Sequence, residues 1–516
     1  MAWGLTGIDA SDPRPGILRE LQVAQGDSGS GGRPRSALII ANMATGTGSG
    51  SVDGLGDALA VPRLITSRQD VIDRFGYHSE GLVGHDSFRR LNTETDLYMM
   101  AVVPGSGAAT VTFTFATAAA ASNALRISAL GETVEIGVAS GDTAITVAAA
   151  FAAKINTQLH WPMTAAIGGG GSEHIVTVTA GFVGTRGDHY MTRIRAAWSR
   201  PSAMTVTKAA ITPGSTDDDH TNAIAGLEGF EIYYQINPKT STSATTSTDN
   251  GIGEHAAALA SRYAPAGGKA EVLHFGATGT NAQAITLAVS VNYHQAFCTW
   301  AESNDYSPLM LAAQACALQA KEEASDRGCP IFDYGPAGNG KPLDVPPPFT
   351  MADRATATEV KAALNNGVTP IEFSAAGKAK ITWQVTTRSE TSSVKDYRVR
   401  AGHIPSVVAD YWEAVRTRHS ATRQLRVADN PAEGEKPLPG FTYPRDTEAL
   451  MRNVIDEKID GSRATLDPAK RAEMKESCSA TLVAGGGAGI SAFVQLSAVK
   501  PNLKSHFLIQ EVSPEI

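Results

Sequence analysis

The chain has 516 residues, with 44 Lys and Arg against 52 Asp and Glu, and its formal net charge at pH 7 is −8. An acidic chain lacks the positive field with which proteins attract nucleic acid, so we expect no direct nucleic-acid binding. Charged residues make up only 19% of the chain and hydrophobic residues 42%, which excludes a charge-driven disordered protein. At roughly 150 residues per domain, this length predicts about three to four domains.

Cysteine usage and the apolar segments indicate the compartment. Four cysteines are spread along the chain without a CxxC pair: Cys298, Cys316, Cys329 and Cys478. This pattern supports neither a disulfide framework nor structural zinc, and a reducing compartment is the default. Residues 1–16 lack the basic and apolar regions of a secretion signal. The most apolar stretches, such as 144–153 and 309–320, are too short or too polar to cross a bilayer. We therefore expect a soluble protein made in the cytoplasm, with no membrane insertion.

Residues 1–35 predict an extended arm with a tether. Pro13 and Pro15 interrupt regular structure, residues 17–23 (ILRELQV) have the character of one strand, and residues 26–32 (GDSGSGG) form a flexible Gly/Ser linker. A strand between a Pro-rich start and a linker has no local partner. It must pair with a distant segment, on this chain or on another.

From residue 36 short apolar strands alternate with helices, which predicts a sheet covered on both faces. The expected strands are 38–43, 97–103, 230–236, 272–275 and 295–300, and the expected helices are 67–75, 80–91, 254–263, 281–289 and 308–325. In the last of these, Ser307 suits the N-cap and Pro308 the first helical position. We assign this α/β core to residues 36–105 and 209–350.

Residues 106–208 have a different pattern, and we expect them to form an inserted, β-rich module. Strands are predicted at 111–115, 125–127, 134–138 and 175–178, three of them with alternating apolar residues, and one helix at 142–156.

Residues 351–516 predict an α+β C-terminal domain. The expected helical segments are 358–364, 404–416 and 446–459, and the expected strands are 370–374, 379–387, 491–499 and 505–512, with Gly377 at the turn of the first pair. The whole chain is therefore expected to be a multidomain α/β protein of mixed α+β character.

Two motifs resemble catalytic signatures, but the residues around each motif do not support the chemistry. Gly335-x4-Gly340-Lys341 has the spacing of a phosphate-binding loop, but Pro342 stands where Ser or Thr must hold Mg²⁺, and no helix follows. The segment Gly26-Asp27-Ser28-Gly29 resembles the nucleophile segment of trypsin-like proteases, but a tether cannot preorganise an oxyanion hole. His85 is a conceivable triad base without an identifiable serine.

Polar clusters elsewhere have ordinary explanations. Residues 217–220 (DDDH) are rich in potential metal ligands, but carboxylates in a loop usually face water. Arg186-Gly187-Asp188 matches a cell-adhesion tripeptide and is expected to form a turn of the inserted module. The remaining histidines, including His255, His274, His294 and His403, show no HxH or HExxH spacing. We predict no catalytic residue, no cofactor and no metal.

The C-terminal third carries a resemblance to a known family. Residues 346–350 (PPPFT) lead to a helix at 359–366, then to 367–370 (GVTP) and to a strand ending 380–387 (KITWQVTT). This succession resembles the tail sheath proteins of contractile-tailed phages, particularly the Mu-like group. The likeness is strongest over 346–426 and covers most of residues 36–516, including the inserted module with VEIGVASGDT at 134–143.

The resemblance implies a subtilisin-like α/β sheath core that is not a protease. It also implies a structural subunit that stacks as rings around a tail tube and contracts to drive the tube through the host envelope. Each subunit would lend its arm and its last strand to neighbours by strand exchange. The residues implied are Ile17, Leu18, Leu21 and Val23 in the arm, and Phe507, Leu508, Ile509 and Val512 in the last strand.

The implied partners are further copies of the chain, the tail tube protein, and the baseplate and tail terminator proteins. The implied location is the contractile tail of a virion, assembled in the host cytoplasm. Two alternatives remain: a degenerate subtilisin-like hydrolase, and a secreted adhesin that uses Arg186-Gly187-Asp188. The missing serine motif weighs against the hydrolase, and the missing secretion signal against the adhesin.

Overall fold

The computed structural model describes residues 35–45, 60–102, 104–230, 232–240, 251–263, 271–293, 295–325, 341–348, 353–374, 376–381, 384–387, 426–427, 430–431, 441–454, 475–483, 489–495 and 504–510. The expected arm at 17–23 and the expected helix at 404–416 lie outside these residues. Among the described helices, none is both long and apolar enough to cross a membrane.

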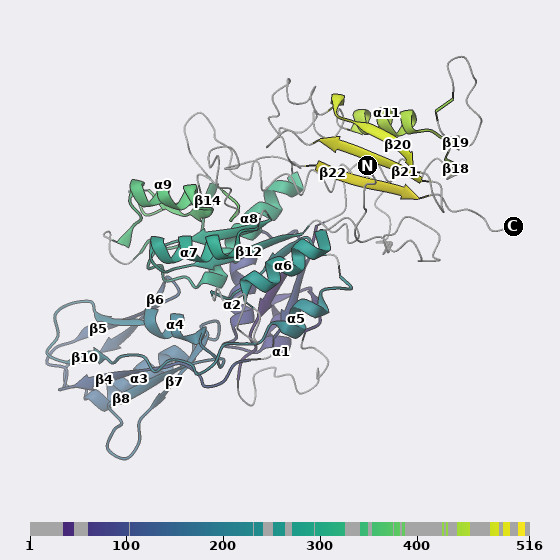
Figure 1. Ribbon diagram of the computed structural model, residues 1–516. Coiled ribbons are helices and arrows are strands. Elements are labelled where there is room, and N and C mark those ends of the chain that lie inside the picture. The colour runs from purple at the N-terminus through teal and green to yellow at the C-terminus, as the bar shows by residue number, and fades with distance from the viewer. Residues whose placement is uncertain are drawn as a thin grey trace.

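A seven-stranded sheet forms the centre of the molecule (Figure 1). Its strands are β1 (Ala37–Ala41), β2 (Arg63–Ile65), β3 (Leu97–Ala101), β11 (Tyr234–Ile236), β12 (Val272–Ala277), β13 (Ala296–Trp300) and β15 (Val368–Pro370), in the order β15-β13-β12-β11-β1-β3-β2. All neighbours are parallel except β2, which runs antiparallel to β3. After β1 the chain forms β2 and β3, which lie on one side of β1 in the sheet. After the inserted module it forms β11, β12 and β13, which lie on the other side of β1. The strand order therefore reverses between β1 and β11.

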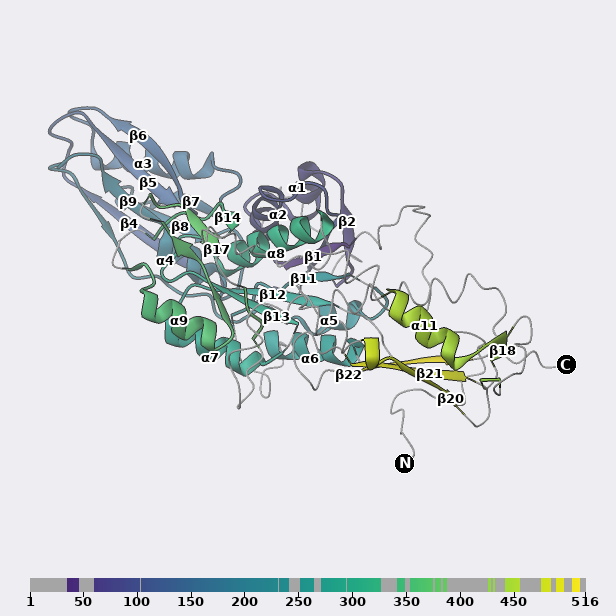
Figure 2. The ribbon, with the colours of Figure 1, turned by 90° about the horizontal axis from the view of Figure 1, so that it is seen from above.

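Helices cover both faces of this sheet, as the view in Figure 2 shows. They are α1 (Arg68–Phe75), α2 (Glu80–Arg89), α5 (Thr221–Gly226), α6 (Ile252–Tyr263), α7 (Asn281–Val291), α8 (Pro308–Ser325) and α9 (Ala357–Asn365). Helices α1, α2 and α8 pack on the face that carries Ile39, whereas α5 packs on the opposite face, with Leu38 and Ile40. Burial of both faces explains why β1, β12 and β13 are buried throughout, are mostly apolar and do not alternate.

Helix α8 is buried along most of its length because it lies between two cores. Leu309, Ala313 and Cys316 belong to the hydrophobic cluster on the face of the sheet that carries Ile39. Met310 and Leu311 belong to the hydrophobic cluster of the inserted module. The start of α8 approaches β12 closely. A Cβ on Gly276 would lie 2.0 Å from the carbonyl oxygen of Pro308, so only glycine fits there.

The described part of the inserted module contains two antiparallel sheets and two helices. The four-stranded sheet has the order β10 (Thr205–Lys208), β4 (Thr110–Ala116), β8 (Ile175–Ala180), β7 (Met163–Ile167), and the three-stranded sheet β6 (Glu132–Val138), β5 (Asn123–Ala129), β9 (Arg195–Trp198). Helix α3 (Ala144–Asn156) packs Phe151 against Phe113 and Phe115, with ring centroids 5.1 and 5.4 Å apart. A short helix that the sequence did not predict, α4 (Gly187–Arg193), lies between β8 and β9.

The chain beyond residue 340 adds a strand to the central sheet, forms a small sheet of its own, and then forms a group of C-terminal elements. Strands β14 (Lys341–Leu343), β16 (Glu372–Phe373) and β17 (Ala379–Ile381) form a small antiparallel sheet. Farther along are β18 (Arg426–Val427), β19 (Phe441–Thr442), α11 (Pro444–Val454), β20 (Ser479–Val483), β21 (Gly489–Gln495) and β22 (Lys504–Gln510). The expected core boundary at residue 350 falls before β15, which pairs with β13 in the central sheet. The predicted fold class, a multidomain α/β protein of mixed α+β character, is confirmed.

Candidate functional site

The segments predicted to exchange strands are described only in part. Ile17, Leu18, Leu21 and Val23, together with Val512, lie outside the described residues. Phe507, Leu508 and Ile509 lie in β22, and the β-sheet register places them opposite Ala492, Ser491 and Ile490 of β21. The last described strand therefore pairs within its own chain.

The sheet to which β22 belongs has two outer strands. Its order is β20-β21-β22, and both pairs are antiparallel. β20 and β22 each pair with β21 along one edge, and no other described strand pairs with their second edge. Helix α11 lies against this sheet (Figure 1), and the N–H of Ala480 in β20 donates to Glu448 Oε1 of α11 at 2.8 Å. An outer strand with unused backbone groups is a template for adding a strand from another segment.

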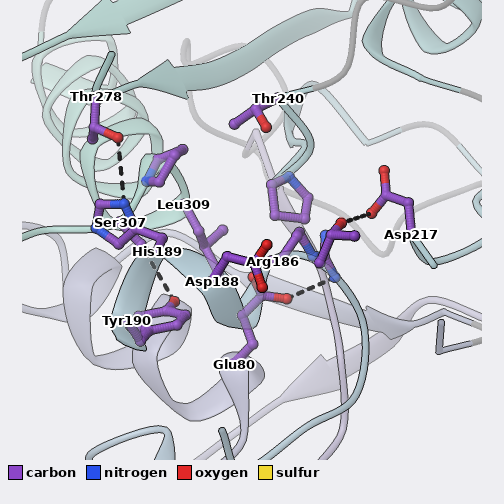
Figure 3. Close-up of a pocket in the computed structure, with 13 residues that line it drawn as sticks. Glu80, Arg186, Asp188, His189, Tyr190, Asp217, Thr240, Thr278, Ser307 and Leu309 are labelled. Carbon is purple, nitrogen blue, oxygen red and sulfur yellow. Dashed lines mark hydrogen bonds and ion pairs between the residues drawn. The ribbon is translucent and has the colours of Figure 1, made fainter. Parts of the chain in front are cut away.

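A second candidate site is a pocket of about 340 Å³ between the core and the inserted module. Its lining comes from the start of α2, the segment around α4, the loops after β11 and β12, and the start of α8 (Figure 3). The loops lie at the carboxyl ends of parallel strands, beside the reversal between β1 and β11. In α/β sheets this is the place where the diverging connections leave a crevice.

A buried ion-pair network forms one wall of the pocket. Arg186 Nη2 lies 2.7 Å from Glu80 Oε2 and 3.1 Å from Asp218 Oδ2, and the three side chains are 7%, 2% and 1% exposed. Asp218 also forms a hydrogen bond with His220, and the N–H of Asn42 donates to Glu80 Oε2 at 3.1 Å. These contacts join α2 of the core to Arg186 of the inserted module and to Asp218, which follows the module.

Two expectations from the sequence are therefore wrong. The DDDH segment was expected to face water, but Asp218 and His220 are buried as partners of the network. Arg186-Gly187-Asp188 was expected to form a turn of the module, but Arg186 is the residue before α4, and Gly187 is the first residue of that helix. Because the Arg186 side chain is buried in ion pairs, this tripeptide is not presented for adhesion.

Burial and the facing charges shift the protonation of the network. Burial raises the pKa of Glu80 to about 7, although Arg186 acts to lower it. Burial also acts to raise the pKa of Asp218, but Arg186 and the hydrogen bond from His220 outweigh it, and the pKa is lowered. Burial acts to lower the pKa of Arg186, and Asp218 and Glu80 reverse this, so the guanidinium stays charged.

Hydroxyl groups and a neutral imidazole form the opposite wall (Figure 3). Tyr190 Oη donates to Ser307 Oγ at 3.0 Å, and Ser307 Oγ also accepts the N–H of Met310 as the N-cap of α8. Thr278 Oγ1 lies 3.4 Å from His189 Nδ1. Burial lowers the pKa of His189 to about 3, so this ring is neutral.

The hydrolase alternative can be compared with this geometry. His85 lies in α2 and its Nδ1 is 2.9 Å from Asp86 Oδ1, while Asp86 is also bound by Arg68. Ser28 lies outside the described residues, as do Gly335 and Gly340 of the phosphate-loop-like motif, and Lys341 begins β14. Within the described part of the chain, no group of three or more His, Cys, Asp or Glu side chains could hold a metal ion.

Comparisons with known proteins found similar solved structures but no matching sequence family. No protein-family model and no curated protein matches the chain. The chain is similar to a sheath tail protein of Listeria innocua, with 10% identity, a TM-score of 0.43, and 93% of this chain and 96% of that chain covered. It is also similar to a sheath tail protein of Desulfitobacterium hafniense, with 14% identity, a TM-score of 0.42, and 94% and 98% covered.

A third similar structure is the baseplate of the anti-feeding prophage, with 13% identity, a TM-score of 0.33, and 60% of this chain and 76% of that chain covered. The first two structures are named as sheath tail proteins, and the third as a baseplate.

Proposed function

We propose that this chain is a structural, non-enzymatic subunit of a contractile tail sheath. It would polymerise with copies of itself as stacked rings around a tail tube, join the baseplate and the tail terminator, and contract to drive the tube through a host envelope. It would be assembled in the host cytoplasm and act in the tail of the particle. The observation that carries the proposal is the place of β22 as an outer strand of the C-terminal sheet.

Strand addition at that edge accounts for linkage between subunits. The seven residues of β22 offer about six backbone hydrogen bonds to an added strand, on the order of 3–9 kcal/mol before ordering costs. The strand-like residues 17–23, with the Gly/Ser tether at 26–32 behind them, match such an added strand. A flexible tether keeps neighbours connected while their packing changes.

Deletion of residues 1–25 tests this function. We expect folded monomers that form no tubes when the purified chain is concentrated and viewed by negative-stain electron microscopy, whereas the full chain forms hollow tubes. A matched control lacks only residues 1–12 and keeps the strand and the tether, so it should form tubes. Tubes of normal length from the 1–25 deletion would contradict the arm's role.

A chemical test addresses the hydrolase alternative. A serine-directed fluorophosphonate should not label the chain, because a serine in a flexible tether has no preorganised oxyanion hole. Labelling that is abolished by Ser28→Ala would favour a hydrolase over a sheath subunit.

A further inference from the structure

The two described sheets of the inserted module have outer strands β10, β7, β6 and β9. At the outer edge of β7, Asn156 Nδ2 donates to Ala165 O and Asn156 Oδ1 accepts the Ala165 N–H, both at 2.8 Å. This amide takes the place of a neighbouring strand. Strands β9 and β10 lie next to each other, and Lys208 Nζ of β10 donates at 2.8 Å to Ile194 O, just before β9. Native proteins cover strand edges because uncovered backbone groups pair with other chains.

Strand β6 is the exception among these outer strands. It pairs with β5 along one edge, and no other described strand pairs with its second edge. The chain just after β9 donates to Ala124 O at 2.9 Å, so Ala124 points toward β9. Its neighbour Leu125 therefore points toward β6, where it lies opposite Ile136. Because the backbone direction alternates, Glu135 and Gly137 direct their N–H and C=O groups away from the sheet.

The outer edge of β6 is accessible, and its glycine has no packing reason within the described chain. Thr133, Glu135 and Gly137 are exposed, whereas Ile136 and Val138 are buried. Apart from its neighbours in sequence, no described atom lies within 4 Å of the position that a Cβ on Gly137 would occupy. Glycine weakens the interior of a strand and often marks a close approach by another backbone. The glycine and the uncovered edge together indicate a strand from outside the chain.

The sequence of β6 is complementary to itself in one antiparallel register. When Ile136 of one copy lies opposite Ile136 of another, each Glu135 lies opposite a Gly137. On the other face of the strand, each Val134 lies opposite a Val138. These apolar side chains then continue the apolar face of the sheet from one copy to the next.

Charge and space favour this register over its alternatives. Glu135 Oε1 lies 2.6 Å from Arg126 Nε of its own chain, and a glycine opposite Glu135 leaves room for both side chains. A register centred on Glu135 would place two carboxylates directly opposite each other, which is unfavourable. A register nearer the β5–β6 turn would meet the core, because a Cβ on Gly131 in that turn would lie 2.5 Å from Pro346.

We propose that two copies of the chain pair through β6 in this register and form a closed two-fold dimer. Their three-stranded sheets then become one continuous sheet. A second copy is the fitting partner because the edge is complementary to itself, and closed two-fold pairs are the commonest oligomers. The dimer leaves β22 unused, so the proposal goes beyond the sheath function and does not rest on it.

Sedimentation velocity of the full chain, from about 1 to 200 µM, measures this dimer. One pair of edge strands is a small interface, so we expect a dissociation constant in about the high micromolar range. Tubes sediment far faster than a dimer and are distinguished from it in the same experiment.

Gly137→Pro removes the edge contact and keeps the pairing with β5. The N–H at this position points away from β5, and proline is tolerated where the missing N–H faces solvent at a sheet edge. We expect the dimer to weaken by at least about tenfold, because the ring also blocks the approach of a second strand. Ile167→Pro is the matched control: Ile167 is exposed at the outer edge of β7, two residues after Ala165, and its N–H also points outward. It should leave the dimer unchanged.

Cross-linking determines the register without the proline variant. Chains with Glu135→Cys and chains with Gly137→Cys, mixed and mildly oxidised, should form a disulfide-linked dimer, because the two positions lie opposite each other. Either variant alone should cross-link far less. Its two cysteines lie two residues out of register, beyond the roughly 7 Å between Cα atoms that a disulfide can span. The unchanged chain, with its own four cysteines, gives the background.

Three results would overturn the proposal. A chain that stays monomeric at about 200 µM would show that the β6 edge does not pair. If Gly137→Pro and Ile167→Pro weaken the dimer equally, the contact between copies lies elsewhere. If either cysteine variant alone cross-links as strongly as the mixture, the two copies do not pair in this register. None of these results bears on tube formation, so the proposal and the sheath function fail separately.

Discussion

Replacing Arg186 by leucine removes the cation that lies between two buried carboxylates. Glu80 and Asp218, 2% and 1% exposed, would lose their ion-pair partner at 2.7 and 3.1 Å. Removal of one partner from a buried ion pair destabilises by about 3–5 kcal/mol, because the remaining charge stays away from water. Since Arg186 joins the module to the core, we expect this loss at their junction.

Hydrogen–deuterium exchange measures the loss locally, which suits a multidomain chain better than one global unfolding curve. Amides of α4 and of the first turn of α2 should exchange roughly a hundred- to several-thousandfold faster in Arg186→Leu, at about 1.4 kcal/mol per tenfold. Amides of β12 and β13, away from the junction, should change far less.

Arg126→Leu is the matched control. Arg126 Nε lies 2.6 Å from Glu135 Oε1 in the same module, but the two side chains are 53% and 51% exposed. An exposed pair of this kind contributes about 0–1 kcal/mol, so exchange should rise less than about fivefold. If the two variants accelerate exchange equally, the burial of the Arg186 network does not determine its strength, and our reasoning is refuted.

Two further predictions concern the same region. Because the pKa of Glu80 is raised to about 7 by burial, the native state holds its proton more tightly than the unfolded state, and the free energy of unfolding at the junction should fall by up to about 3 kcal/mol as pH rises from about 5 to 8. Glu80→Gln places an uncharged amide at this position and should flatten the pH dependence of the free energy of unfolding in exchange measurements. An unchanged slope would show that another group causes the pH dependence. Gly276→Ala places a methyl group 2.0 Å from the oxygen of Pro308 and should destabilise by about 1–3 kcal/mol in thermal unfolding. Gly137→Ala, which has nothing within 4 Å, should change stability by less than about 0.5 kcal/mol, and equal losses would contradict the steric argument.

Features with local causes were predictable from the sequence. Helix α8 was expected at the residues where it lies, because an N-cap serine and a first-turn proline act within one turn of the helix. The strands β4, β5, β6 and β8 follow from short-range patterns of apolar residues, and the change from α/β alternation to these strands is the reason to expect an inserted module. The α/β class follows from that alternation alone.

The tertiary structure alone decided which distant residues meet. β15 pairs with β13 in the central sheet. No local pattern in the sequence shows whether residues 368–370 belong to that sheet or begin another domain. Arg186 meets Glu80, 106 positions away in the chain, and Asp218. A charged residue read by itself is expected to face water. Whether it can be buried depends on a partner charge that only folding brings within about 3 Å, because an unpaired charge would not remain there.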